Sequence, residues 1–346
     1  MTPLFLGLAG THLTEAERSL FQSLDPAGFI LFARNVESLD QVRALTDALC
    51  DLAGREELPV LIDQEGGRVA RLKPPLVPAF PPAATFGMAW EKAPATAMAA
   101  ARTNAEAIGT ILASVGITVD CLPLLDVPQA GAHDIIGDRA FGHDPLAVAA
   151  LGRATLDGLQ RSGVVGVVKH IPGHGRAGAD SHLDLPVVEA TDEELEADLF
   201  PFRRLADAPM AMTAHILYPA WDGELCATLS PTIIGDIIRR RIGFDGLLMS
   251  DDLGMHALAH QPGADQMGRR AARALEAGCD IALHCSGNFK EMEEIAAQVP
   301  AMTAEASARL ARAMAWRHRA RVPRAGDAEA PGQLIARRDA LLEAAG

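Results

Sequence analysis

Residues 145–170, PLAVAALGRATLDGLQRSGVVGVVKH, contain one complete passage from a helix to a strand. Pro145–Arg161 has the amphipathic pattern of a helix, and Gly163 stands where a C-terminal cap belongs. Val164–His170 then runs apolar without alternation, which is typical of a strand buried on both faces. This stretch therefore predicts a helix followed by a buried parallel strand that ends on two polar residues, Lys169 and His170.

The same alternation continues along the chain. We predict strands at Leu4–Ala9, Phe29–Phe32, Pro59–Asp63, Ile117–Leu124, Val164–His170, Met210–His215, Gly246–Ser250 and Asp280–His284. We expect helices at Thr14–Leu24, Ser38–Leu52, Pro94–Val115, Pro145–Arg161, Asp192–Ala206, Pro231–Arg241, Ala264–Ala277 and Phe289–Gln298. Eight β–α repeats predict an α/β fold, a single (β/α)8 barrel of the TIM type, and an open doubly wound sheet is the alternative.

The barrel is expected to occupy residues 1–300. Residues 301–346 are expected to form a C-terminal helical extension and tail, because an Ala/Arg-rich helix is followed by VPRAGDAEAPG (322–332) and a last short helix. We expect no second core-forming domain.

Composition limits the classes of partner. The chain has 346 residues, 49% of them hydrophobic, and a formal charge of −14. This acidic balance repels phosphate backbones and anionic lipids, which argues against nucleic acid and membrane surfaces as partners. Five scattered cysteines without a CxxC pair are typical of buried thiols in a reducing compartment. With neither a signal peptide nor an apolar span of bilayer length in view, a cytoplasmic location is expected.

The barrel predicts where chemistry should occur, because active sites of this fold lie in the loops after the strands. After the third strand, IDQEGGRVARL (62–72) supplies Asp63, Arg68 and Arg71. A carboxylate and a guanidinium at one strand end suit the recognition of neighbouring sugar hydroxyls. An Asp–Arg pair that only fixes the turn is an equally good interpretation of this spacing.

The segment that follows the fifth strand, KHIPGHGRAGADSH (169–182), is the richest in chemistry. It places Lys169, His170, His174, Asp180 and His182 within fourteen residues. A carboxylate two residues before a loop histidine can orient and support an imidazolium that transfers protons. Zinc binding is the alternative, but Pro172 and Gly173 break the helix that an H-x-x-x-H pair would need.

Other strand ends carry further candidates. The seventh strand ends on Asp251 and Asp252, which cannot both point inward because neighbouring strand residues alternate faces. The loop after the fourth strand contributes Asp126, Asp138 and Arg139, each more typical of a structural charge than of a ligand. The sixth and eighth strands are followed by His215, Tyr218, Trp221, His284, Cys285 and Ser286, of which the aromatic rings could stack on a sugar.

Five segments together resemble the bacterial β-N-acetylhexosaminidases of glycoside hydrolase family 3, the cytoplasmic type that recycles peptidoglycan. They are GFILFARN, IDQEGGRVARL, IGDRAFG, KHIPGHGRAGADSH and IGFDGLLMSDDLGM, in this order. The resemblance covers the whole predicted barrel.

The resemblance implies a retaining hydrolase that removes terminal β-linked N-acetylglucosamine from muropeptide fragments. It makes Asp251 the nucleophile, gives Asp252 a supporting role, and makes His182 the general acid/base with Asp180 as its partner. The residues that it assigns to sugar binding are Asp63, Arg71, Arg139, Lys169 and His170. Neither a metal nor a cofactor is implied, and a monomer is favoured.

The departures from the family pattern are Ile171, Arg176 and Gly254, and of these Arg176 could alter the acid/base loop. Relatives that act on glucosides commonly take a glutamate acid from an additional domain, which is not seen here. Three other functions stay open at this point: a zinc hydrolase, a sugar-binding barrel without activity, and a phosphorylase.

Overall fold

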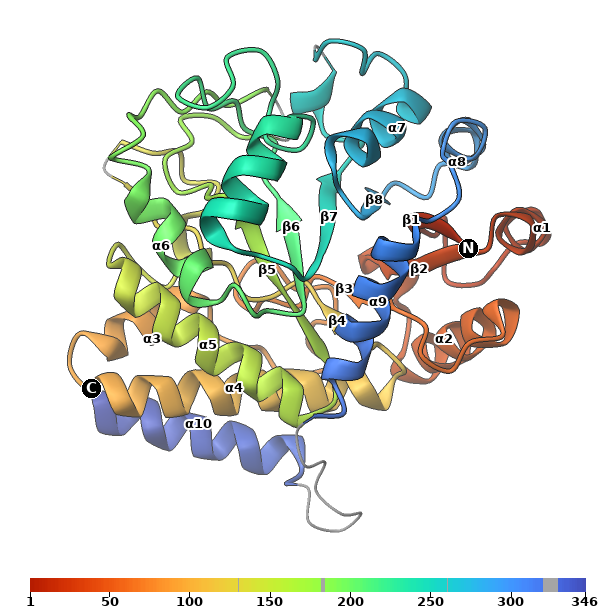
Figure 1. Ribbon diagram of the computed structural model, residues 1–346. Helices are drawn as coiled ribbons and strands as arrows, with labels where there is room; N and C mark the ends of the chain where they lie inside the picture. Colours follow the sequence, from red (N-terminus) through yellow and green to blue (C-terminus); the bar gives the residue numbers. More distant parts are fainter. Residues whose placement is uncertain (130, 182–183, 260, 320–328) are drawn as a thin grey trace.

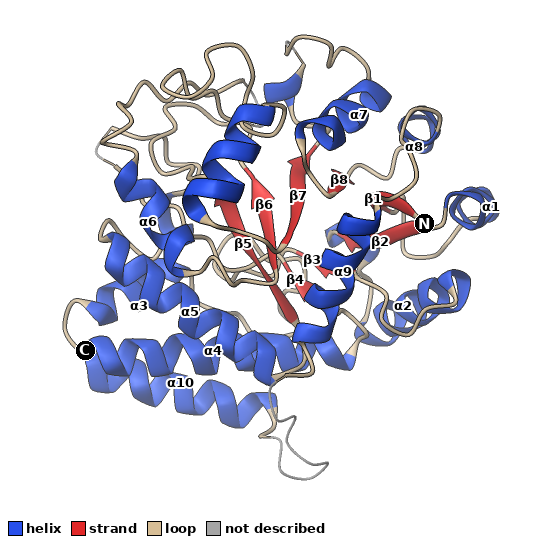
Figure 2. Ribbon diagram, in the orientation of Figure 1, coloured by secondary structure: helices blue, strands red, loops and turns tan. Residues whose placement is uncertain are grey.

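Eight parallel strands close into a barrel, as the sequence predicts. The computed structural model describes residues 1–129, 131–181, 184–259, 261–319 and 329–346. Each strand pairs with its neighbour in chain order, and the last pairs with the first, which closes the sheet (Figure 2). The strands are β1 (Thr2–Gly7), β2 (Pro26–Leu31), β3 (Val60–Ile62), β4 (Val119–Asp120), β5 (Val165–Ile171), β6 (Met210–Thr213), β7 (Leu247–Asp252) and β8 (Ile281–His284).

Helices surround the strands (Figure 1). They are α1 (Glu15–Leu24), α2 (Leu39–Ala53), α3 (Ala83–Trp90), α4 (Pro94–Ser114), α5 (Pro145–Arg161), α6 (Glu196–Arg204), α7 (Met267–Ala277), α8 (Phe289–Ala296), α9 (Ala304–Trp316) and α10 (Pro331–Ala345). The connection between β6 and β7 is the π-helical segment η3 (Ile233–Ile242), and three short 3₁₀ turns are η1 (Ala33–Asn35), η2 (Gly137–Arg139) and η4 (His256–Leu258).

The helix ends follow the capping residues of the sequence. Thr14 and Glu17 form a complete capping box at the start of α1, and the Ser38 hydroxyl accepts from the Gln41 amide at the start of α2. At the other end of a helix, Gly243 and Gly278 cap η3 and α7 in the left-handed conformation, with φ of 81° and 115°.

The predicted fourth strand, Ile117–Leu124, is much shorter in the structure. Its regular pairing ends at Asp120, because the Leu122 amide turns back to the Asp120 carbonyl and Pro123 has no amide hydrogen to donate. The chain still runs beside β5, since the Leu125 amide donates to the Lys169 carbonyl. The helix α3 was not predicted, and it fills the long connection after β3.

Strand side chains alternate between two apolar cores. Phe5 points into the barrel with Ile30, Leu61 and Val119, whereas its neighbours pack outward against the helices. On α9, Leu310, Ala313 and Met314 join the inner core, and the helix lies against the beginnings of the strands (Figure 1). The barrel interior is therefore filled with side chains, and polar chemistry is left to its opposite end.

The last helix, α10, packs along α4 and carries the buried residue Arg338 (Figure 1). The Arg338 guanidinium donates to Asn104 Oδ1 at 3.0 Å and lies over the Phe80 ring, 5.7 Å from its centre. The Phe80 carbonyl accepts from the Gly67 amide in the turn after β3. The C-terminal helix thus supports a loop that comes from the polar end of the barrel. Residues 320–328, which include most of the predicted linker, lie outside the described part of the chain.

No helix in the described part of the chain is both long and apolar enough to cross a bilayer.

Replacing Arg338 by Ala removes the hydrogen bond to Asn104 and the stacking on Phe80, and leaves a buried amide oxygen without its donor. We expect the free energy of unfolding to fall by about 1–3 kcal/mol, which a thermal melt would register as a lower Tm. The neighbouring variant Arg337→Ala is the control, since the Arg337 side chain is 43% exposed and pairs with the exposed Glu329 and, at 3.7 Å, with the half-buried Glu106. Equal melting temperatures for the two variants would contradict this role of Arg338.

Candidate active site

A cavity of about 350 Å³ opens at the carboxyl ends of the strands. Its wall includes residues at the ends of five strands: Phe32 after β2, Asp63 after β3, Lys169 on β5, Asp251 on β7 and Cys285 after β8. All five residues that the resemblance assigns to sugar binding contribute to its wall, namely Asp63, Arg71, Arg139, Lys169 and His170.

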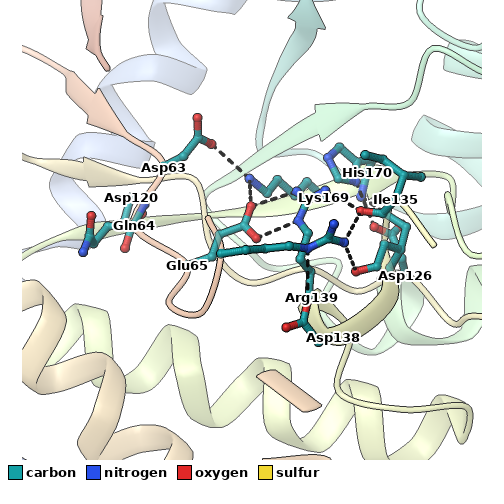
Figure 3. A network of polar contacts seen from close by, with 12 residues as sticks. Asp63, Gln64, Glu65, Asp120, Asp126, Ile135, Asp138, Arg139, Lys169 and His170 are labelled. Atoms are coloured by element: carbon teal, nitrogen blue, oxygen red, sulfur yellow. Dashed lines mark hydrogen bonds and ion pairs between the residues drawn. The ribbon is translucent and has the colours of Figure 1, made fainter. Parts of the chain in front are cut away.

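The centre of the site is the Lys169 ammonium, which is only 2% exposed (Figure 3). Lys169 Nζ lies 3.1 Å from Asp63 Oδ1 and 2.7 Å from Glu65 Oε1. Burial opposes the positive charge, but the two carboxylates outweigh it and raise the pKa of Lys169 above its ordinary value. Because β5 and the loop after β3 are joined through this cation, Lys169 fixes the relative position of the two strand ends.

Two arginines complete the charged wall. Arg139 makes a bidentate pair with Glu65, with both N–O distances at 2.9 Å, and Arg71 donates to Asp63 Oδ2 at 2.9 Å. Burial would raise the pKa of Asp63 and of Glu65, but the Lys169 charge and the arginines hold both pKa values below their ordinary range.

Glu65 is a site residue that the sequence analysis did not single out. The sequence did carry a signal for Glu65, because Glu65 follows Asp63 by two positions, and residues two apart along an extended chain point to the same side.

Asp120 is a second residue that the sequence analysis did not single out. It is buried beneath the charged wall, and its Oδ1 accepts from the Gln64 amide. Burial raises the pKa of Asp120 well above its ordinary value.

Asp126 holds two histidines in place. Its Oδ2 lies 2.8 Å from His170 Nδ1, and its Oδ1 accepts from the backbone amides of His170 and His174 at 3.1 and 2.7 Å. The His170 ring therefore has its Nε2 left for the cavity that it lines. Charge and hydrogen bonds from His170 offset the burial of Asp126 and lower its pKa to about 2. The expectation that Asp126 is a structural charge agrees with these contacts.

His174 is neutral in this arrangement. Burial, helped by the nearby His170, lowers the pKa of His174 to about 4. Its Nε2 lies 3.3 Å from the hydroxyl of Ser181, which also lines the cavity. Ser181 stands between the two predicted acid/base residues. Asp180 belongs to the described part of this loop, whereas His182 lies outside the described residues.

Asp251 and Asp252 have different surroundings. The Asp252 carboxylate accepts from the amides of Cys285 and Gly254 at 3.0 and 3.1 Å, which binds it to the neighbouring loops. Asp251 accepts from the Asp252 amide at 2.8 Å. Both aspartates line the cavity, so the prediction that only one of them points inward is wrong; the strand register is irregular between Met249 and Asp252. Burial raises the pKa of Asp251, but the charges of His170 and Lys169 and the hydrogen bond from the Asp252 amide outweigh burial, so the net pKa is below its ordinary value.

The remaining candidates face elsewhere. The Tyr218 hydroxyl donates to the Gly173 carbonyl and Trp221 donates to Asp192, so neither ring lines the cavity. Arg176 donates to Asp198 at 2.6 Å and to the Glu194 carbonyl at 2.8 Å, which ties its loop to α6 and to the turn before it.

Arg68 pairs with Asp138 and donates to the carbonyls of residues 134–136.

Among residues that the structure describes, no three His, Cys, Asp or Glu side chains are grouped as metal ligands.

Replacing Lys169 by Met leaves Asp63 and Glu65 buried with one arginine each, Arg71 and Arg139, to offset their desolvation and mutual repulsion. At least one carboxylate pKa then rises above its unfolded value, so the folded state binds the additional proton. The stability of the variant therefore falls as pH rises, and its deficit relative to wild type is larger at pH 7.5, about 3–5 kcal/mol, than at pH 4.5.

Thermal melts at the two pH values measure this difference. Arg43→Met is the control, since Arg43 pairs with Asp47 on an exposed helix face and should change the melts little at either pH. A deficit of Lys169→Met that is equal at both pH values would contradict the charge network.

Comparison with known proteins gives one consistent result. Residues 6–316 match the glycosyl hydrolase family 3 N-terminal domain. A β-hexosaminidase of Alkalilimnicola ehrlichii is 42% identical over 82% of this chain and 80% of its own length. A β-hexosaminidase of Chromobacterium violaceum is 40% identical over 92% of this chain and 88% of its own length.

Solved structures agree with the sequence relatives. The crystal structure of NagZ from Neisseria gonorrhoeae in complex with N-trifluoroacetyl-D-glucosamine superposes with a TM-score of 0.83. It is 31% identical in sequence, and the match covers 100% of this chain and 98% of that one. With its barrel, its charged cavity and these relatives, the chain belongs to glycoside hydrolase family 3 and is a β-N-acetylhexosaminidase of that family.

Proposed function

We propose that this hexosaminidase is a retaining enzyme that removes non-reducing terminal β-linked N-acetylglucosamine from muropeptide fragments in peptidoglycan recycling. Asp251 is the nucleophile, and His182 with Asp180 is the acid/base pair. The observation that carries the proposal is the placement of Asp251 in the same cavity as the cluster around Lys169. A sugar held by that cluster would present its anomeric carbon to a rigid carboxylate.

The nucleophile must be ionised when the substrate arrives. The pKa of Asp251 lies below its ordinary value, because neighbouring positive charges outweigh burial, and the carboxylate is therefore charged across the neutral range. Asp251 attacks the anomeric carbon, and the bond from that carbon to the leaving oxygen breaks. The product of this step is a glycosyl-enzyme ester.

The charged wall supplies both donors and acceptors for sugar hydroxyls. Lys169, Arg71 and Arg139 donate, and the carboxylate of Asp63 accepts. His170 contributes Nε2, because its Nδ1 is bonded to Asp126. These side chains already hold one another in place, so they lose little conformational freedom when a sugar binds among them.

The acid/base role is assigned to His182. A histidine has an unperturbed pKa of about 6.5, close to neutrality, so one ring can give and take a proton in the same cycle. Protonated His182 donates to the leaving oxygen in the first step. Neutral His182 then removes a proton from water, whose oxygen attacks the anomeric carbon and releases Asp251. Asp180 orients the ring and stabilises its charged form.

The substrate class rests on the relatives. The gonococcal neighbour binds an N-acylated glucosamine, which favours N-acetylglucosamine as the glycosyl group here. The peptidoglycan-recycling type of this family acts on N-acetylglucosamine linked to anhydro-N-acetylmuramic acid, with or without peptide, and we assign this aglycone to the present enzyme. The same resemblance supports a cytoplasmic, monomeric enzyme, and the formal charge of −14 argues against nucleic acid and membrane partners.

Proton NMR of the hydrolysis of an aryl β-N-acetylglucosaminide tests the mechanism. We expect the β-anomer of N-acetylglucosamine to form first, since two inversions at one carbon retain its configuration. Initial release of the α-anomer would refute the double displacement. N-acetylglucosamine 1-phosphate formed in phosphate buffer would instead indicate phosphorolysis.

The two adjacent acids can be separated by mutation. Asp251→Asn should lower kcat by at least about 10³-fold, because an amide cannot form the glycosyl-enzyme ester. Asp252→Asn keeps an oxygen acceptor for the Cys285 and Gly254 amides and should retain clearly more activity. The reverse order of activities would exclude Asp251 as the nucleophile.

The acid/base assignment predicts a dependence on the leaving group. His182→Ala should lower kcat/KM about 10²–10⁴-fold for an alkyl or disaccharide substrate, whose leaving oxygen needs a proton. With 2,4-dinitrophenolate as leaving group, no proton is needed and kcat/KM should stay near wild type. A loss that does not depend on the leaving group would remove His182 from this role.

A further inference from the structure

His215 is a fully buried histidine directly behind the proposed nucleophile. It follows β6, its exposure is 0%, and it does not line the cavity. Its Nε2 lies 3.0 Å from the backbone carbonyl oxygen of Asp252, and its Nδ1 lies 2.7 Å from the hydroxyl of Thr228. The imidazole thus bridges β7 and the loop that contains Thr228.

The hydrogen bonds define the tautomer of His215. A carbonyl oxygen only accepts, so Nε2 carries the hydrogen. Nδ1 of the neutral ring then accepts from the Thr228 hydroxyl, which in turn lies 2.7 Å from the hydroxyl of Thr213 and accepts from it. The Thr228 hydroxyl could instead donate its hydrogen to the Ala214 carbonyl, but that distance is longer, 3.2 Å, so the hydrogen bond to His215 Nδ1 is the stronger of the two.

The charges around His215 agree with a neutral ring. Burial lowers the pKa of His215, and the charge of His170 acts in the same direction. Asp251 and Asp252 act against them, but the net pKa stays below its ordinary value. His215 is therefore a donor of fixed orientation at neutral pH.

This donor acts on the residue that holds the nucleophile. The Asp252 amide donates to Asp251 Oδ1, and the Asp252 side chain accepts from two loop amides. The Asp252 carbonyl accepts from His215 and from the Met255 amide. The amide, the carbonyl and Oδ1 of Asp252 are thus engaged, and His215 is the side chain that connects this residue to β6.

We propose that His215 is a positioning residue for the glycosylation step, with Thr228 and Thr213 fixing its tautomer. The inference rests on the proposed function, in which Asp251 attacks the anomeric carbon. A carboxylate displaced by a fraction of an ångström loses alignment with that carbon, and a displacement of about 1 Å can cost about 10²-fold in rate.

The test compares His215→Leu with His215→Gln in the full-length enzyme. The Leu side chain cannot donate to the Asp252 carbonyl, whereas the terminal amide of Gln reaches about the position of Nε2. For aryl N-acetylglucosaminides we expect kcat/KM to fall about 10–100-fold with Leu and to recover most of this loss with Gln. The loss should be equal for good and poor leaving groups, since it concerns attack and not proton donation.

A second measurement separates positioning from general damage. The inhibition constant of N-acetylglucosamine reports sugar binding, and it should match wild type in both His215 variants because the wall around Lys169 is untouched. His284→Leu is the matched control: His284 is also fully buried at a strand end, but its contacts are Glu291 and Ser286. This control should keep kcat/KM near wild type, even if its Tm falls.

Thr228→Val removes the hydrogen bond from Thr228 to His215 with a nearly isosteric change. It tests the positioning role of His215 even if His215→Leu does not fold. We expect a smaller loss in kcat/KM of about 3–10-fold, at an unchanged inhibition constant. Wild-type kcat/KM in His215→Leu or Thr228→Val, or equal losses with Leu and Gln, would overturn the inference. If wild-type enzyme lacked hexosaminidase activity or Asp251→Asn kept it, the proposed function would fail instead.

Discussion

The ion pairs of Lys169 with Asp63 and Glu65 are the interaction on which the site depends. A buried ammonium costs several kcal/mol of desolvation unless carboxylates and further donors surround it. Arg71 and Arg139 complete this arrangement, and each brings its own loop to the strand ends. The charges that would bind a sugar therefore also hold the mouth of the barrel together, so the binding surface is formed before any substrate arrives.

The residues assigned to sugar binding, nucleophilic attack and proton transfer are held in place by different interactions. The charged wall is held by its own ion pairs, and His170 is held by Asp126 beneath it. The proposed nucleophile stands on β7, where Asp252 and His215 fix the backbone around it. The proposed proton donor belongs to a glycine-rich loop whose base Arg176 ties to Asp198. Binding and attack thus use groups with fixed neighbours, and proton transfer is assigned to the loop.

Sequence periodicity predicted the barrel because strands buried on both faces leave long apolar runs, as in Val164–His170. It overestimated β4, where Pro123 ends the regular pairing. It also missed α3, whose sequence AATFGMAW has no polar face from which a helical period could be read. The strand-end rule and the family resemblance together located the cavity residues. Glu65 could have been found from its spacing to Asp63, but the roles of Asp120 and His215 could not, because they depend on contacts between strands that are distant in the chain.

The central claim is that Asp251 carries the sugar during turnover. A fluorinated N-acetylglucosaminyl donor, whose ester is hydrolysed slowly, would allow this intermediate to accumulate for peptide mass spectrometry. The account predicts a label of one sugar per chain, located on the Asp251 carboxylate, and loss of the label in Asp251→Asn. A label on Asp252, or hydrolysis of the donor by Asp251→Asn at the wild-type rate, would contradict it.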